Sequence, residues 1–251
     1  MSMKKKQIIL LSVLMFLKMA IAEATPSQLF WTPCTTDIQS AGVFHLNVNN
    51  YFDMSNHCHP HDSIPPDAGL RLGLFTWNDF ATDLGFDYYG GVHYPLLFNA
   101  KVGITDDKLF SNSPSMSFGI FNAGAGENGR VLRNVINFVV GKDLPEGPNC
   151  VGGRIFCGVY AGLTSFKSKN VGGMAGYERG FGMTKHHDGK EYKKWILKGD
   201  YASGKNAQGG GGIGLGYYFT PTILLVGGPT WISHNEENGK FKVGIQLQID
   251  I

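Results

Sequence analysis

The densest group of residues able to do chemistry is the run His57-Cys58-His59-Pro60-His61-Asp62. In an extended loop, the alternating side chains of His57, His59 and His61 can point the same way, and imidazole beside a thiol suits Zn²⁺ or Cu²⁺. Prolines in and after the run leave the shape of this loop open, so a solvated histidine-rich loop is the alternative. We keep the three histidines as candidate metal ligands and expect no cofactor.

Two glycine-rich runs resemble phosphate-binding loops. Residues 124–129 match the G-x-G-x-x-G pattern, but no second βαβ unit follows and residues 135–140 have the pattern of a strand. Residues 199–206 end on Asn206, where a P-loop requires the Ser or Thr that binds Mg²⁺. Glycines at such positions supply turn conformations with positive φ. Both runs are therefore predicted to be connections between strands, with no nucleotide bound.

The N-terminus has the features of a secretory signal peptide. Three lysines at positions 4–6 precede the apolar stretch 8–17, and residues 20–22 form an A-x-A cleavage site. The apolar stretch is too short to span a membrane, and Lys18 interrupts it. We therefore expect residues 1–22 to be removed on export.

The composition excludes several classes of protein. Of the 251 residues, 43% are apolar, 12% aromatic and 17% charged, and 35 are glycine, which fits a sheet protein and argues against disorder. Cleavage removes four of the 22 basic residues and none of the 20 acidic ones. The mature chain is then slightly acidic, and no basic patch indicates nucleic acid. A lipoprotein needs a cysteine directly after the cleavage site, and Cys34 lies too far along the chain.

Strict alternation of apolar and polar residues predicts the strands. From Phe241 to Ile251 every second residue is apolar, which is the period of a β-strand. Soluble strands average about five or six residues, whereas a membrane-spanning strand needs roughly 9–11 and carries one lipid-facing apolar side. The terminal segment has the length and pattern of a membrane strand.

The same alternation recurs along the chain. It is clear near residues 44–52, 68–74, 94–104 and 213–219, and weaker near residues 83–90, 115–123, 134–142, 153–166, 172–184, 191–202 and 222–232. Together with the last strand, these segments predict about twelve strands, an even number as in bacterial barrels. The predicted fold is all-β, with an antiparallel transmembrane β-barrel over residues 43–251 that follows a periplasmic N-terminal segment, residues 23–42.

In these features the chain resembles Gram-negative outer-membrane β-barrels, and among them the porin-like group of about twelve strands. Aromatic residues near the strand ends add to the resemblance, namely Tyr51, Phe52, Trp77, Tyr217, Tyr218 and Trp231. The resemblance implies a passive channel for small polar solutes, without catalysis, whose partners are outer-membrane lipids and the barrel-assembly machinery. One departure is Ile251, because such barrels usually end in Phe or Trp. The oligomeric state stays open.

The inward face of the predicted strands is polar. Period two assigns to it His45, Asn47, Asn49, Arg71, Asp87, Asn99, Lys101, Asn137, Arg154, Lys198, Asp200, Lys242, Gln246 and Gln248. Five of these are Lys or Arg and two are Asp, so a pore lined by them would mildly favour anions. The alternative is a filled interior in which the charges pair, because twelve strands fall between filled and open barrel sizes.

Which cysteines can form a disulfide depends on the orientation of the barrel in the membrane. With both termini in the periplasm, Cys34, Cys150 and Cys157 lie near the periplasmic rim and Cys58 lies in the first external loop. Disulfides persist in an oxidising compartment. We expect one disulfide among the three rim cysteines, with Cys34–Cys150 preferred.

Three alternatives to a channel remain. Ser55 and His57 form the one nearby Ser–His pair on an external loop that would suit an outer-membrane lipid hydrolase. A non-conducting barrel would instead present its loops in adhesion. A soluble β-sandwich or lipocalin-like barrel would have shorter strands and would bury its apolar face.

Overall fold

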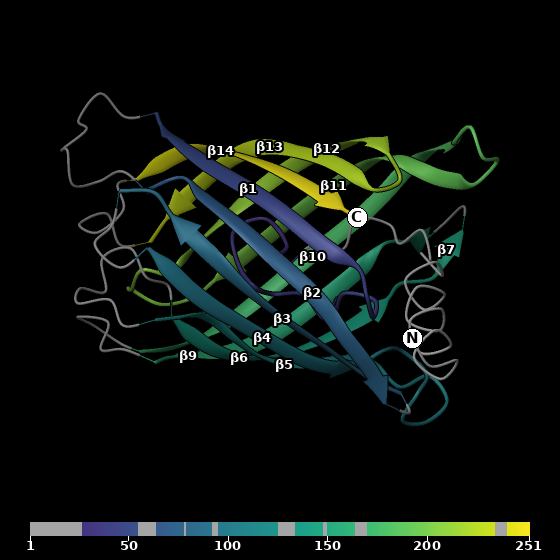
Figure 1. Cartoon of the computed structure of the whole chain (residues 1–251), viewed down its shortest axis with the longest axis horizontal. Helices are drawn as coiled ribbons and strands as arrows, with labels where there is room; N and C mark the ends of the chain where they lie inside the picture. Colours follow the sequence, from purple (N-terminus) through teal and green to yellow (C-terminus); the bar gives the residue numbers. More distant parts are fainter. Residues whose placement is uncertain are drawn as a thin grey trace, which may run out of the picture.

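The computed structural model describes residues 27–54, 64–77, 79–91, 95–124, 134–147, 150–163, 170–233 and 240–251. Twelve antiparallel strands close into one barrel (Figure 1). They are β1 (Phe44–Asp53), β2 (Asp67–Trp77), β3 (Phe80–Tyr89), β4 (Leu96–Ile104), β5 (Ser115–Ala123), β6 (Val135–Asp143), β9 (Arg154–Gly162), β10 (Val171–Lys185), β11 (Glu191–Ala202), β12 (Gly210–Thr220), β13 (Ile223–Ile232) and β14 (Phe241–Asp250). The all-β, twelve-stranded barrel expected from the sequence is confirmed.

Each strand of the barrel pairs with its neighbours in the sequence. Strand β1 closes the ring on β14, from His45 opposite Asp250 to Asp53 opposite Lys242. Closure gives every strand two partners, so the barrel leaves no sheet edge unpaired. A separate two-stranded hairpin, β7 (Glu146–Gly147) and β8 (Cys150–Val151), lies between β6 and β9 in the chain.

The barrel wall is apolar outside and polar inside. On β14, Phe241 and Ile245 are exposed, whereas Lys242 and Gln246, which follow each of them, are buried. The same alternation runs around the wall, and the exposed large side chains are mostly apolar. This arrangement is the reverse of the buried apolar face that a soluble barrel requires. The described residues include no helix with the length and apolar character to cross a membrane.

The strand directions divide the connections between two ends. The connections after β1, β3, β5, β9, β11 and β13 lie at one end, here called the loop end. The C-terminus and the connections after β2, β4, β6, β10 and β12 lie at the other, the turn end (Figure 1). The expectation that both termini lie in the periplasm would put the turn end there, and which end faces the cell exterior stays a prediction.

The N-terminal segment is the main departure from expectation. From the sequence, residues 23–42 are expected to lie in the periplasm, yet residues 27–36 are buried and their purple trace loops within the barrel (Figure 1). We call residues 27–39 the lumen segment. Its apolar side chains account for this position, because the barrel interior offers them pockets shielded from water.

Candidate functional site

The lumen segment places three consecutive apolar side chains inside the barrel. Leu29, Phe30 and Trp31 are each 0% exposed. Removing one such side chain from water is worth about 1.5–3 kcal/mol. The three residues therefore anchor the segment in the lumen.

Each anchor fills a different apolar pocket in an otherwise polar interior. Leu29 belongs to a cluster with Phe121, Val135, Val139, Phe156, Tyr160, Met174, Ala202, Ala207 and Cys34. Phe30 belongs to a cluster with Ile196, Leu224 and Val226. Trp31 packs with Tyr51, Ile64 and Ile232, and its ring meets the Tyr51 ring edge-on at a centroid distance of 5.6 Å. The wall side chains in these clusters interrupt the polar inward face at the positions that receive the segment.

Glycines in the wall make room for Phe30. A Cβ atom at Gly212 would lie 2.6 Å from Phe30 Cδ1, and one at Gly214 would lie 2.7 Å from Phe30 Cδ2. Real Cβ atoms do not approach other atoms so closely. The Phe30 ring therefore packs directly against the backbone of Gly212 and Gly214 on the inner face of β12. We call these two residues the glycine floor.

The carboxylate of Asp200 holds the turn of the lumen segment. It accepts hydrogen bonds from the backbone N–H groups of Phe30 (3.2 Å), Trp31 (3.0 Å) and Thr32 (2.7 Å). It also accepts a hydrogen bond of 2.8 Å from the Thr32 hydroxyl. Successive N–H groups of this kind form a concave anion site, and here the anion is a side chain of the barrel wall.

Further wall side chains donate to the backbone carbonyls of the segment. Gln246 Nε2 donates to the Phe30 carbonyl at 2.6 Å, and Asn137 Nδ2 donates to the Pro33 carbonyl at 3.0 Å. The Lys101 ammonium donates to the Asp37 carbonyl at 3.0 Å. These contacts run along the segment from its turn to its exit.

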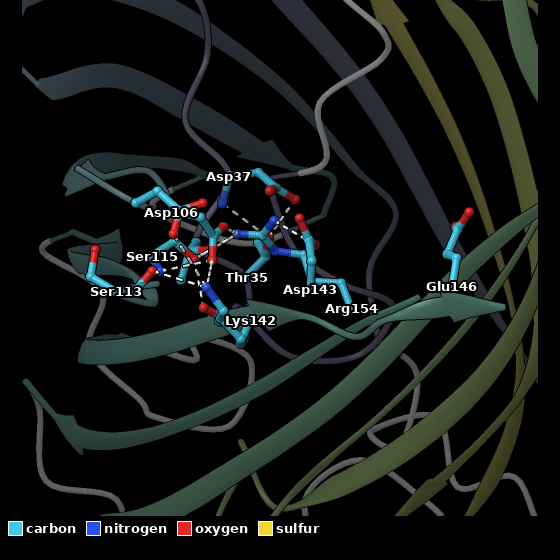
Figure 2. Close-up of polar contacts among 12 residues, drawn as sticks. Thr35, Asp37, Asp106, Ser113, Ser115, Lys142, Asp143, Glu146 and Arg154 are labelled. Atoms are coloured by element: carbon cyan, nitrogen blue, oxygen red, sulfur yellow. Dashed lines mark hydrogen bonds and ion pairs between the residues drawn. The ribbon is translucent and has the colours of Figure 1, made fainter. Parts of the chain in front are cut away.

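A charged cluster at the turn end holds the segment where it leaves the lumen (Figure 2). We call it the rim cluster and define it by Asp106, Ser115, Lys142, Asp143 and Arg154. Arg154 Nη2 lies 2.7 Å from Asp106 Oδ2, and its Nη1 lies 2.9 Å from Asp143 Oδ1. The same guanidinium donates to Ser115 Oγ at 2.6 Å and to the hydroxyl of Thr36 in the lumen segment at 3.2 Å. Arg154 thus ties the segment to two strands and a turn.

A second contact at the turn end attaches the small β7–β8 hairpin. Lys193 Nζ of β11 donates to Glu146 Oε1 of β7 at 2.8 Å. This hydrogen bond and the positive charge of Lys193 hold the pKa of the exposed Glu146 carboxyl below its usual range. The pair belongs to the surface and does not reach the lumen segment.

The residues predicted for the inner face are almost all buried. Thirteen of the fourteen are classed as buried, and the Arg154 side chain at the rim is 19% exposed. Five of them contact the lumen segment directly, namely Lys101, Asn137, Arg154, Asp200 and Gln246. Their role as the lining of an open pore stays a prediction.

Sequence reasoning missed several buried carboxylates. The buried charged side chains of the described residues comprise five carboxylates, Asp67, Asp83, Asp87, Asp200 and Asp250, against four from Lys or Arg. Pairs form between them and their neighbours, such as Asp250 with His45 at 2.6 Å and Asp83 with Arg71 at 3.7 Å. Asp67, Asp83 and Asp250 have the same period-two phase as the inward residues of their strands, so extending each pattern by two or four residues would have found them.

Comparison with known proteins gives a likeness of fold. The chain is similar to porins. A mutant of the Rh. blastica porin matches with a TM-score of 0.40 and 12% identity over 74% of this chain and 55% of the porin, so this chain spans about half the porin's length. The NanC porin matches with a TM-score of 0.41 and 9% identity, over 82% of this chain and 98% of that one. A structure described under the in-meso crystallization of membrane proteins matches with a TM-score of 0.47 and 9% identity, over 83% of both chains. No protein-family model and no curated protein matches the chain.

The expected disulfide is wrong for the cysteines that the structure describes. Cys34, Cys150 and Cys157 are all free. Cys34 is buried inside the barrel, whereas Cys157 is exposed on the outer face of β9 and Cys150 is exposed on β8. Because the lumen segment lies inside the barrel, Cys34 is not at the rim. The barrel wall lies between Cys34 and the outward-facing Cys157.

Thiol labelling will report the position of the lumen segment. In the folded barrel we expect a water-soluble maleimide to label Cys150 rapidly and Cys34 only after unfolding, because the Cys34 thiol is shielded from solvent. Peptide mapping by mass spectrometry would measure both rates. Equal rates at Cys34 and Cys150 in the folded protein would show that the segment leaves the lumen.

Several predicted sites lie outside the described residues. These are the signal peptide, the hydrolase candidate Ser55, Cys58, the metal candidates His57, His59 and His61, and all of the 124–129 run except Gly124. Within the described ranges, no group of three or more His, Cys, Asp or Glu side chains could hold a metal ion. The other glycine run is divided between β11 and the following connection, in which Asn206 Oδ1 accepts the N–H of Gln208 at 3.0 Å.

Proposed function

We propose that this chain is an outer-membrane channel for small polar solutes whose lumen is closed by its own residues 27–39. The observation that carries the proposal is a barrel with an apolar exterior and a polar interior, in which a segment of the same chain occupies the interior. A polar lumen is what water-filled barrels use for passage. None of the barrel strands includes residues 27–39, so their removal would leave the strands of the wall complete.

The outer membrane is the location that fits the wall. Barrel strands of 9 to 15 residues are as long as, or longer than, the roughly 9–11 residues that span a bilayer. The exposed apolar side chains would contact lipid, and the N-terminal signal pattern would direct export. Outer-membrane lipids and the barrel-assembly machinery are therefore the proposed partners.

Charging the outer face of the wall tests the membrane location. Leu215 lies in the middle of β12 and is 48% exposed. In lipid, Leu215→Lys should destabilise the barrel by about 2–4 kcal/mol, because a cation at the bilayer midplane is costly. Unfolding by urea in liposomes would measure the loss. Leu109→Lys on the exposed 105–114 turn is the matched control, and an equal effect of the two substitutions would contradict a lipid-facing Leu215.

The solute preference depends on the balance of charge inside the barrel. The sequence predicts a mild preference for anions, but among the described residues five buried carboxylates outnumber four buried Lys and Arg side chains. The electric fields of these positive and negative side chains oppose each other in the lumen. The reversal potential measured under a salt gradient shows whether the channel prefers anions or cations.

Conductance in a planar bilayer tests the channel itself. We expect the refolded chain from residue 23 onward to conduct little, and a variant lacking residues 27–39 to give discrete conductance steps. If the shortened barrel is inserted and heat-modifiable but does not conduct, the channel is excluded. A lipid hydrolase, tested by Ser55→Ala, or an adhesive barrel, tested by deleting residues 53–66, would then replace it.

A further inference from the structure

Most polar contacts between the wall and the lumen segment involve backbone groups, which every peptide has. Asp200 accepts three consecutive backbone N–H groups, those of residues 30–32. Gln246, Asn137 and Lys101 donate to the carbonyls of residues 30, 33 and 37. A barrel that only needed to be filled would achieve this with its own side chains, as small barrels do.

We propose that the lumen is a binding site for short peptides, which residues 27–39 occupy in cis and which a separate peptide of the same chemistry occupies once they have left. The proposal rests on the proposed function, since it names a ligand class for the same lumen. The peptide-site proposal is more specific than the channel proposal, because it requires defined contacts between the wall and a peptide backbone.

The contacts define the peptide that would bind. Three consecutive residues must donate their N–H groups to Asp200, so proline is excluded at the positions of Phe30, Trp31 and Thr32. Three apolar side chains must enter three separate pockets, and the Phe30 pocket has a glycine floor that accepts an aromatic ring. Downstream residues contribute carbonyl oxygens, the Thr36 hydroxyl and the Gln39 N–H group, which donates to Asp83 at 3.3 Å. The ligand class is therefore a peptide with an apolar, aromatic-rich turn followed by an irregular stretch.

The attachment of the segment makes exchange testable in the folded protein. Ser40, Ala41 and Gly42 are exposed between the lumen segment and β1, and a Cβ atom at Gly42 would meet nothing within 4 Å. A protease site inserted between Ala41 and Gly42 would allow the segment to be cut after the whole chain has folded. The insertion would disturb the bridge of Ala41 to Gly73 on β2 and the adjacent hydrogen bond from Gly42, but the pairing of β1 with β14 begins only at His45 and would be kept.

The experiment measures binding of a synthetic peptide to the cut barrel. The variant is folded into phosphatidylcholine–phosphatidylglycerol vesicles, cleaved and washed, and a fluorescein-labelled peptide with the sequence of residues 27–40 is added. We expect saturable binding that the unlabelled peptide competes away. If the cut segment does not wash out, the barrel refolded without residues 27–39 is used with the same peptide.

Matched controls test recognition of the backbone. A peptide N-methylated at Trp31 and Thr32 keeps its side chains but loses two donors to Asp200, so it should bind about tenfold more weakly or worse. In the barrel, Asp200→Asn should weaken binding of the unmodified peptide by a similar factor. Asp188→Asn, on the exposed turn between β10 and β11, should change nothing.

The outcomes separate this inference from the channel. A cut or shortened barrel that conducts but binds no peptide overturns the peptide site and leaves the channel intact. A barrel that binds the peptide but never conducts supports the peptide site and excludes the channel. Equal affinity for the N-methylated and unmodified peptides would overturn recognition through the backbone.

Discussion

Asp200→Asn is expected to release the turn of the lumen segment and to raise the conductance of the full-length barrel. The substitution removes the charge that receives the N–H groups of residues 30–32 and turns an amide toward them. Hydrogen bonds to a charged group are worth about 1.5–3 kcal/mol each, and a buried donor without an acceptor is costly. We expect the free energy of unfolding to fall by about 2–4 kcal/mol.

Two measurements check this prediction together. Urea unfolding of the refolded protein gives the loss of stability, and single-channel recording gives the fraction of time that the barrel conducts. Asp188→Asn changes the same chemical group on the exposed turn and should alter stability by no more than about 0.5 kcal/mol. Loss of stability without any new conductance would show that Asp200 supports the wall but does not keep the lumen closed.

Gly212→Ala is expected to push Phe30 out of its pocket. The new Cβ would lie 2.6 Å from Phe30 Cδ1 and 2.9 Å from the Thr230 methyl group. Adding a methyl group to a filled space typically costs about 1–3 kcal/mol. The aromatic ring cannot bend away as a flexible chain end would, so the segment must move with it.

The partner substitution decides whether Phe30 is the residue that clashes. Phe30→Ala alone should destabilise the protein by about 3–5 kcal/mol, but in the double variant the effect of Gly212→Ala should largely disappear. A double-mutant cycle by urea unfolding measures this coupling. Gly227→Ala is the control, because its Cβ would meet only the Gly244 carbonyl at 3.8 Å. Strictly additive effects would contradict the contact between Phe30 and the glycine floor.

The wall of this protein could be predicted from the sequence. The side chains of a strand alternate between two sides, and in a membrane barrel those sides meet lipid and lumen, so period two assigns the face of each residue without knowledge of its partners. Gln246 and Gln248 are buried and Ile245 is exposed for this reason. An even number of antiparallel strands is what allows β1 to close on β14 in an antiparallel pair.

The contents of the lumen were decided only by the tertiary structure. The lumen segment has no alternation of apolar and polar residues, so its local sequence says nothing about what surrounds it. The sequence alone therefore places it in the periplasm, with Cys34 at the rim. Its position depends on contacts between residues far apart in the chain, such as Trp31 with Asp200, which are separated by 169 residues. Gly212 has a polar-face position in the sequence, but whether it faces water or the Phe30 ring depends on what fills the space between opposite walls. Alternation determines which face of the wall each residue occupies. What fills the lumen depends instead on the volume of the barrel interior and on contacts with wall residues that only the closed barrel brings together.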